Sequence, residues 1–279
     1  MTVTDHWPSV NHDSAAYCRS VLVGYVRGLS PRRRTVVVAA ALLALALMAA
    51  LVGPRLVDGL RDEAARGAPD RPGPVLLVPG YGGGTGSLQQ LAEAMRADGR
   101  TATVLDLPGD GTGDLREQAA ALDRAVTGSG AESVDLIGFS AGGVVVRVWV
   151  QEYDGPARAR RIVTLGTPHH GAGIAAAGSA VPGACPTACQ QLVPGSRLLA
   201  DLASPVPTPP AWLSVWTADD QTVTPPDSAR LPGAVNVELQ SVCPDARPGH
   251  GGLPTDPTVT RLVREAIGAA PLAEPVPGC

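Results

Sequence analysis

The sequence predicts an α/β domain built on a mainly parallel sheet of about six strands, with helices on both faces and one transmembrane helix before it. Two observations lead to this prediction. From Pro74 onward, short runs rich in β-branched residues alternate with stretches of helical hydrophobic periodicity, a pattern typical of a parallel sheet covered by helices. Before them, residues 35–53 form a run of 19 uncharged residues, about the length that spans a bilayer as a helix.

Six short runs are the strand candidates. They are Val75–Val78, Thr103–Leu107, Val134–Gly138, Ile162–Leu165, Leu213–Trp216 and Val235–Leu239. Helices are expected between them, where apolar residues recur three, four or seven positions apart. The clearest sets are Leu88, Leu91 and Met95; Leu115, Ala119, Leu122 and Val126; and Val259, Leu262, Val263 and Ile267. Ligands of such sheets bind beyond the carboxyl ends of the strands, so the residues that follow each strand are the candidates for a site.

The N-terminal segment predicts a membrane anchor. Arg32, Arg33 and Arg34 stand directly before the uncharged run, and mixed charges follow it. Basic residues favour the cytoplasmic side, so residues 1–34 are expected in the cytoplasm, 35–53 across the membrane, and the rest outside. A cleaved signal peptide, cut near residue 46 or 50, is the alternative and would give a secreted protein. Residues 54–73 are expected to be a stalk or linker, and residues 74–279 the main domain.

Composition bounds the function. The chain has 279 residues, 44% of them hydrophobic, and a net charge of −4. It contains no lysine, and its first 74 residues hold nine arginines against six acids, so the main domain is acidic. A nucleic-acid binder should present a basic face, and this domain has none. Cys185, Cys189, Cys243 and Cys279 lie on the expected outer side, where three pairings are open.

The stretch Gly138-Phe139-Ser140-Ala141-Gly142 marks a candidate nucleophile. It lies between a predicted strand and a predicted helix running from Ala141 to about residue 149, which is the context of a nucleophile elbow. A tight glycine-bounded turn would lift the serine to the edge of the sheet. The glycine-rich loop Pro79–Gly84, after the first strand, could bring a backbone N–H close to a substrate oxygen. We therefore expect an oxyanion hole from the N–H groups of Tyr81 and Ala141.

A nucleophilic serine needs a base and an acid that orients the base. Asp219 and Asp220 follow the strand that ends at Trp216, and His250 follows the last strand. Ser140, Asp220 and His250 thus occur in the chain order serine, acid, histidine. Asp219 is the alternative acid. His169 and His170 precede both acids, so a structural role in their loop is expected, and no metal site is predicted.

These motifs resemble those of small bacterial triacylglycerol lipases and esterases of the α/β-hydrolase superfamily. The resemblance covers about residues 74–267. It rests on the segments 78–83, 138–143, 164–171, 220–226 and 250–253, of which Gly166-Thr167-Pro168-His169-x-Gly171 is the most family-specific. Pro79 departs from it, because many members have histidine there. The resemblance implies an α/β-hydrolase catalytic domain with Ser140 as nucleophile and His250 as base, and its spacing to Val223 favours Asp220 as the acid.

The expected activity is serine-dependent hydrolysis of carboxylic esters, acylglycerols or similar lipid esters, without a cofactor and by a monomer. Residues 171–210 are long for a connection between strands, so they are expected to form a cap or pocket wall. The same triad could instead serve an acyltransferase, a thioesterase or a peptidase. A non-catalytic binding protein on a hydrolase fold is a further alternative, which an intact triad disfavours.

Overall fold

The computed structural model describes residues 30–33, 35–37, 39–40, 42–43, 48, 71–202 and 204–279. The chain divides into two units, residues 1–63 and 64–279. In the first unit, every described residue from 31 to 48 is helical. Among the described residues, no helix is long and apolar enough to cross a bilayer. Much of the predicted span 35–53, all of residues 1–29 and most of the predicted stalk lie outside those residues.

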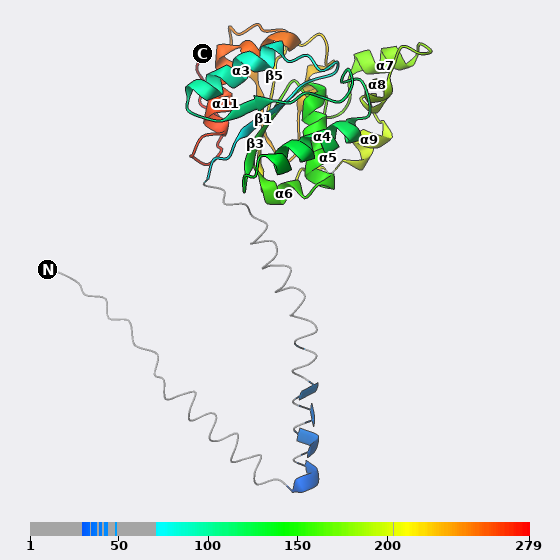
Figure 1. Ribbon diagram of the computed structural model, residues 1–279, viewed down its shortest axis with the longest axis vertical. Helices are drawn as coiled ribbons and strands as arrows, with labels where there is room; N and C mark the ends of the chain where they lie inside the picture. The colour runs from blue at the N-terminus through cyan, green and yellow to red at the C-terminus, as the bar shows by residue number, and fades with distance from the viewer. Residues whose placement is uncertain are drawn as a thin grey trace, which may run out of the picture. The chain divides into compact units, whose positions relative to one another are not determined.

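A six-stranded sheet with the order β2-β1-β3-β4-β5-β6 organises the second unit, and every neighbouring pair is parallel (Figure 1). The strands are β1 (Val75–Val78), β2 (Ala102–Val104), β3 (Val134–Phe139), β4 (Ala159–Leu165), β5 (Ala211–Trp216) and β6 (Val235–Glu238). All six predicted strands are therefore present. The prediction of β2 as 103–107 was too long, since this edge strand ends at Val104 and only Leu105 N–H still bonds Leu77 O, at 2.9 Å.

Helices cover both faces of the sheet, as predicted. The long ones are α3 (Gly86–Ala97), α4 (Leu115–Gly128), α5 (Ala141–Glu152) and α11 (Pro257–Ala266). The short ones are α6 (Gly155–Arg158), α7 (Gly173–Ser179), α8 (Thr187–Gln191), α9 (Arg197–Asp201), α10 (Leu239–Val242), η1 (Pro226–Ala229) and η2 (His250–Thr255). The helices α7 to α9 all fall within the predicted insertion 171–210.

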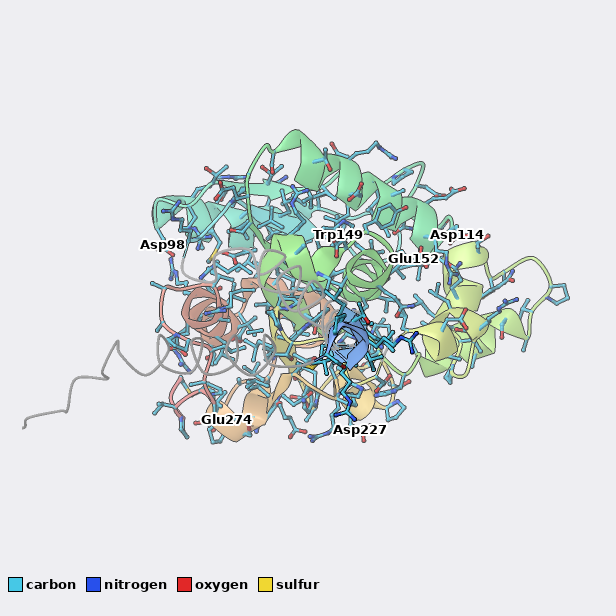
Figure 2. All side chains as sticks on the ribbon, turned by 90° about the horizontal axis from the view of Figure 1, so that it is seen from below. Asp98, Asp114, Trp149, Glu152, Asp227 and Glu274 are labelled. Carbon is cyan, nitrogen blue, oxygen red and sulfur yellow. A yellow bond between two sulfur atoms is a disulfide. The ribbon has the colours of Figure 1, made fainter. Side chains whose placement is uncertain are left out.

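Two hydrophobic clusters lie on opposite faces of the sheet. One joins the strands to α4 and α5 and includes Trp149, which is fully buried and lies inside the unit in Figure 2. The other joins the strands to α3 and α11, where the predicted periodic residues Leu88, Leu91 and Met95 are buried. The strands β3 and β4 are buried almost throughout because they lie in the middle of the sheet between both clusters.

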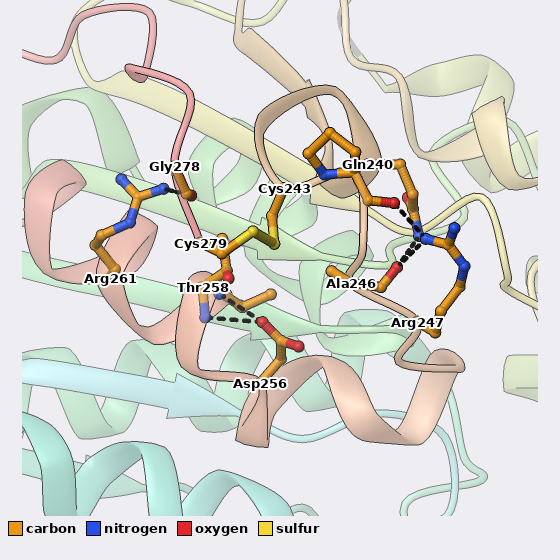
Figure 3. Close-up of a disulfide and its surroundings, with 11 residues drawn as sticks. Gln240, Cys243, Ala246, Arg247, Asp256, Thr258, Arg261, Gly278 and Cys279 are labelled. Atoms are coloured by element: carbon orange, nitrogen blue, oxygen red, sulfur yellow. Dashed lines mark hydrogen bonds between the residues drawn. A yellow bond between two sulfur atoms is a disulfide. The ribbon is translucent and has the colours of Figure 1, made fainter.

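Two disulfides pair the four outer cysteines. Cys185, just before α8, bonds Cys189 within that helix. Cys243 bonds Cys279 at the end of the chain (Figure 3). Of the three pairings open to the sequence, this one closes a local loop in the insertion and fixes the C-terminal residues beside the segment that leads to His250. Gly278 N–H also donates to Val242 O at 2.7 Å.

Candidate active site

Ser140 sits at the sharp turn between β3 and α5. Its backbone adopts φ 52° and ψ −127°, a conformation that costs free energy for a non-glycine residue and is often found at functional sites. The flanking glycines are required by close approach. A Cβ at Gly138 would lie 2.5 Å from Gly143 Cα, and one at Gly142 would lie 2.2 Å from Val78 O. The backbone therefore makes a sharp strand–turn–helix corner at Ser140, as the sequence predicted.

A chain of hydrogen bonds joins the three predicted residues. The Nε2 atom of His250 lies 2.9 Å from Ser140 Oγ, and its Nδ1 atom lies 2.6 Å from Asp220 Oδ2. Because the carboxylate can only accept, Nδ1 carries the hydrogen and Nε2 of a neutral ring is left to accept from the serine hydroxyl. The Phe139 ring lies 5.1 Å from the histidine ring, centroid to centroid. This arrangement can remove a proton from Ser140.

The two adjacent acids differ in what they contact. The Oδ1 atom of Asp220 accepts the N–H groups of Thr222 and Val223, both at 2.8 Å, which leaves Oδ2 directed at His250. The Asp219 carboxylate is half-exposed, and its closest cation is the Arg247 guanidinium, at 3.9 Å. The structure thus brings Asp220 to the histidine and leaves Asp219 at the surface.

The two backbone groups expected to form an oxyanion hole lie on either side of Ser140. Ala141 is the first residue of α5, so its N–H has no acceptor within the helix. The loop after β1 packs on the serine, since a Cβ at Gly80 would lie 2.9 Å from Ser140 Cβ. Within the described part of the chain, no hydrogen bond uses the N–H of Tyr81 or of Ala141. Both donors are free for a substrate oxygen.

An apolar cavity of about 290 Å³ opens beside Ser140. Its walls come from the loop after β1, the segment 168–192 and the loop after Asp220. The lining residues are Tyr81, Ser140, Pro168, Ala172, Ile174, Ala175, Gly178, Ala184, Cys189, Leu192, Thr222 and Val223. None of them carries a charge, so the cavity suits an aliphatic group better than an ionic one. The insertion provides seven of these twelve residues, and the sequence could indicate its contribution only as a range.

His169 and His170 do not join the hydrogen-bond chain at Ser140. His170 is exposed and lies 3.0 Å from Arg230 O. His169 is buried, and its Nε2 lies 3.1 Å from Thr164 Oγ1. Burial, reinforced by the charge of Arg147, holds the pKa of His169 well below its usual range. Burial also lowers the pKa of Arg147 to about 10.

The donors and acceptors around His169 determine its tautomer. Ser214 donates to Ala229 O, and Thr164 donates to Ser214 Oγ. The Thr164 oxygen must therefore accept from Nε2–H of a neutral His169, while Nδ1 has no hydrogen-bond partner among the described residues. This histidine is a neutral core residue that ties β4 to the loop after it.

Among the residues that the structure describes, no group of three or more His, Cys, Asp or Glu side chains could hold a metal ion. One polar residue near the site was missed from the sequence. Gln240, on α10, contacts both the loop that carries Asp220 and the loop that leads to His250. No motif marks it, and its position just after β6 was the only available signal.

Comparison with known proteins identifies the fold. A family model described as "alpha/beta hydrolase fold" matches residues 73–180. The fold is that of the α/β-hydrolases. Comparison with curated protein sequences gives no significant match.

Several solved structures share this fold at low sequence identity. Aspergillus fumigatus lipase B aligns with a TM-score of 0.59 and 17% identity, over 70% of this chain and 52% of that one. MGS-MChE2, an α/β-hydrolase from a lagoon-sediment metagenome, gives 0.52 and 19%, over 69% and 90%. A structure from work on the metagenome-derived lipolytic enzymes LipS and LipT gives 0.51 and 20%, over 66% and 86%. The chain thus spans about half the length of the fungal lipase.

Proposed function

We propose that this protein hydrolyses carboxylic esters through a covalent acyl-enzyme on Ser140, with lipid esters such as acylglycerols as substrates. The observation that carries the proposal is the continuous hydrogen-bond chain from Ser140 Oγ through His250 to Asp220 Oδ2, set at the mouth of an apolar cavity. The resemblance of the sequence to small lipases and esterases is consistent with it.

The first chemical step follows from this geometry. As Ser140 Oγ attacks the ester carbonyl, His250 Nε2 takes its proton, and Asp220 stabilises the imidazolium that results. The negative charge that develops on the carbonyl oxygen accepts from the N–H groups of Tyr81 and Ala141. Each such donor contributes on the order of 3 kcal/mol to lowering the barrier. His250 then gives the proton to the leaving alcohol, and water releases the acid by the same steps.

The cavity supports an acyl rather than a charged substrate. Its uncharged lining would bury an alkyl chain, and each buried methylene contributes about 0.8 kcal/mol to binding. At about 290 Å³ it is at the small end of ligand pockets. We expect kcat/KM to rise with acyl length, and then to fall once the chain exceeds the cavity.

A ladder of p-nitrophenyl esters from C2 to C16, with matched thioesters and a casein digest, tests the proposal. We expect ester hydrolysis with an optimum at intermediate length, and a loss on the order of 10⁶-fold in Ser140→Ala. Retention of a tenth of the activity in that variant would contradict the proposal. Faster turnover of thioesters, or cleavage of casein, would assign the triad to a thioesterase or peptidase.

We further propose that the catalytic unit lies outside the cytoplasm. Two disulfides pair all four of its cysteines, and disulfides persist in oxidising compartments. The triple arginine before the uncharged run favours the same orientation. Alkaline phosphatase fused after Gly73 should be active, and a stable but inactive fusion would contradict this orientation.

A further inference from the structure

The side chain of Gln240 connects the two loops that carry the acid and the base. The acid loop, residues 217–220, follows β5 and contains Asp220. The histidine loop, residues 243–250, follows α10 and ends at His250. Gln240 lies on α10 itself, between them, and its side chain is partly buried. It reaches both loops at once.

Every hydrogen-bonding group of the Gln240 amide is used. Its Oε1 accepts Ala218 N–H at 3.0 Å, and its Nε2 donates to Thr217 Oγ1 at 2.9 Å and to Ala246 O at 3.1 Å. The orientation of the amide is fixed by these partners, because Ala218 supplies a donor and Ala246 an acceptor. Figure 3 shows the bond from Gln240 to Ala246.

These contacts act on the residues next to the triad. Thr217 is fully buried and its carbonyl accepts Asp220 N–H at 3.3 Å, so the threonine that Gln240 holds also holds the acid. Ala246 lies four residues before His250, and its N–H donates to Cys243 O at 3.0 Å, in the residue that is disulfide-bonded to Cys279. The amide therefore fixes the separation between the acid loop and the histidine loop.

We infer that Gln240 is a positioning residue for ester hydrolysis: it holds Asp220 Oδ2 against His250 Nδ1 by joining their loops. The inference rests on the proposed function. Displacement of a catalytic group by about 1 Å can cost up to about 100-fold in rate. Since Gln240 does not line the cavity, its loss should act on turnover and leave substrate binding unchanged.

The structure supplies a matched control that spans the same loops. Arg247, in the histidine loop, approaches Asp219 of the acid loop at 3.9 Å and also donates to Ala246 O. The Arg247 side chain is mostly exposed and the Asp219 carboxylate is half-exposed, and exposed ion pairs contribute little. If any contact between the loops sufficed, Arg247 would matter as much as Gln240.

The test compares Gln240→Met, Gln240→Asn and Arg247→Ala with the wild type in the full chain. Methionine keeps the length but removes all three hydrogen bonds, and asparagine keeps the amide but is too short to reach both loops. We expect kcat for a short p-nitrophenyl ester to fall between about 10- and 100-fold in both Gln240 variants. We expect KM within twofold of wild type, and Arg247→Ala within twofold in both constants. Active sites are counted by fluorophosphonate titration, so that unfolded protein does not enter kcat.

A second readout separates positioning from general stability. The proton shared by His250 Nδ1 and Asp220 should give the most downfield resonance in the proton NMR spectrum of the wild type, and this resonance should shift or broaden in Gln240→Met and persist in Arg247→Ala. An unchanged kcat per active site, or equal losses in Gln240→Met and Arg247→Ala, would overturn the inference. A wild type inert towards every ester and fluorophosphonate would instead refute the proposed function itself.

Discussion

The two ends of the sheet each hold a buried carboxylate beside basic side chains. Only at one end does the basic side chain also face a hydroxyl group and a cavity. At the carboxyl end, Asp220 contacts His250, whose second nitrogen faces Ser140 and the cavity. At the amino end, Asp135, the second residue of β3, lies 2.7 Å from Arg160 and 2.5 Å from Arg100. The side chains of Asp135 and Arg160 are fully buried.

The two ends differ in what the basic side chains beside the carboxylate contact and in whether they can accept a proton. At the amino end, Arg160 and Arg100 donate their other N–H groups to backbone carbonyls, among them those of Ile267 and Gly268 at the end of α11. A guanidinium keeps its proton at all ordinary pH values, so this cluster only ties the end of α11 to the sheet. The imidazole of His250 instead faces the Ser140 hydroxyl through an acceptor nitrogen, so the pair at the other end can do chemistry.

The largest expected effect is a loss of turnover from a substitution at the carboxyl end of the sheet. Asp220→Asn should lower kcat by about 10⁴-fold, because the amide no longer stabilises the imidazolium or fixes its tautomer. Asp219→Asn changes the adjacent carboxylate at the surface. Its kcat should stay at least 100-fold higher than that of Asp220→Asn. Steady-state kinetics on one ester measure both variants. The reverse order would make Asp219 the acid and would contradict the loop geometry described above.

The second effect is a loss of stability from a substitution at the amino end of the sheet. Asp135→Asn leaves two arginines beside a neutral amide, and breaking a buried ion pair costs about 3–5 kcal/mol of unfolding free energy. Turnover per titrated active site should stay the same. Asp98→Asn is the control, because Asp98 pairs with Arg264 at the surface and should cost less than about 1 kcal/mol. Urea unfolding gives both values, and a loss of turnover without a loss of stability would refute the assignment.

A third effect concerns His169. Its folded pKa is lowered by burial, so below about pH 6.5 the unfolded chain binds a proton that the folded protein does not. The unfolding free energy should therefore fall as pH drops below that value, by at most about 1.4 kcal/mol per pH unit. His169→Gln should flatten this dependence, and His170→Gln, at the exposed neighbour, should leave it unchanged. Equal slopes in all three proteins would rule out a neutral His169.

The smallest effect concerns the cavity. Ile174 is exposed at its rim and lines it, whereas Val181, also exposed, does not. Ile174→Ala should lower kcat/KM for medium-chain esters relative to acetate by about tenfold, because apolar contact with the chain is lost. Val181→Ala should leave this ratio unchanged. If the two variants behaved alike, the cavity would not be the acyl site.

The structure was most predictable from the sequence where local rules fix it. The strand–turn–helix around Ser140 follows from its glycines, and chain order brought Asp220 and His250 forward as partners. The insertion was predicted as a cap or pocket wall, but the pairing of the cysteines and the individual lining residues were not, because both depend on contacts between segments that only the folded chain brings together. Gln240 was missed for the same reason: its three bonds join segments that are adjacent only in the folded chain. No motif marks Asp135 as the centre of an ion-pair cluster, since its two arginines lie 35 and 25 residues away.

Labelling with a fluorophosphonate, followed by peptide mapping, shows whether Ser140 is the nucleophile. We expect a single adduct on Ser140 in the wild type, none in Ser140→Ala, and much slower labelling in Asp220→Asn. The folded fraction of Asp135→Asn should label at the wild-type rate. A folded wild type that does not react, or an adduct on a different serine, would show that Ser140 is not the nucleophile.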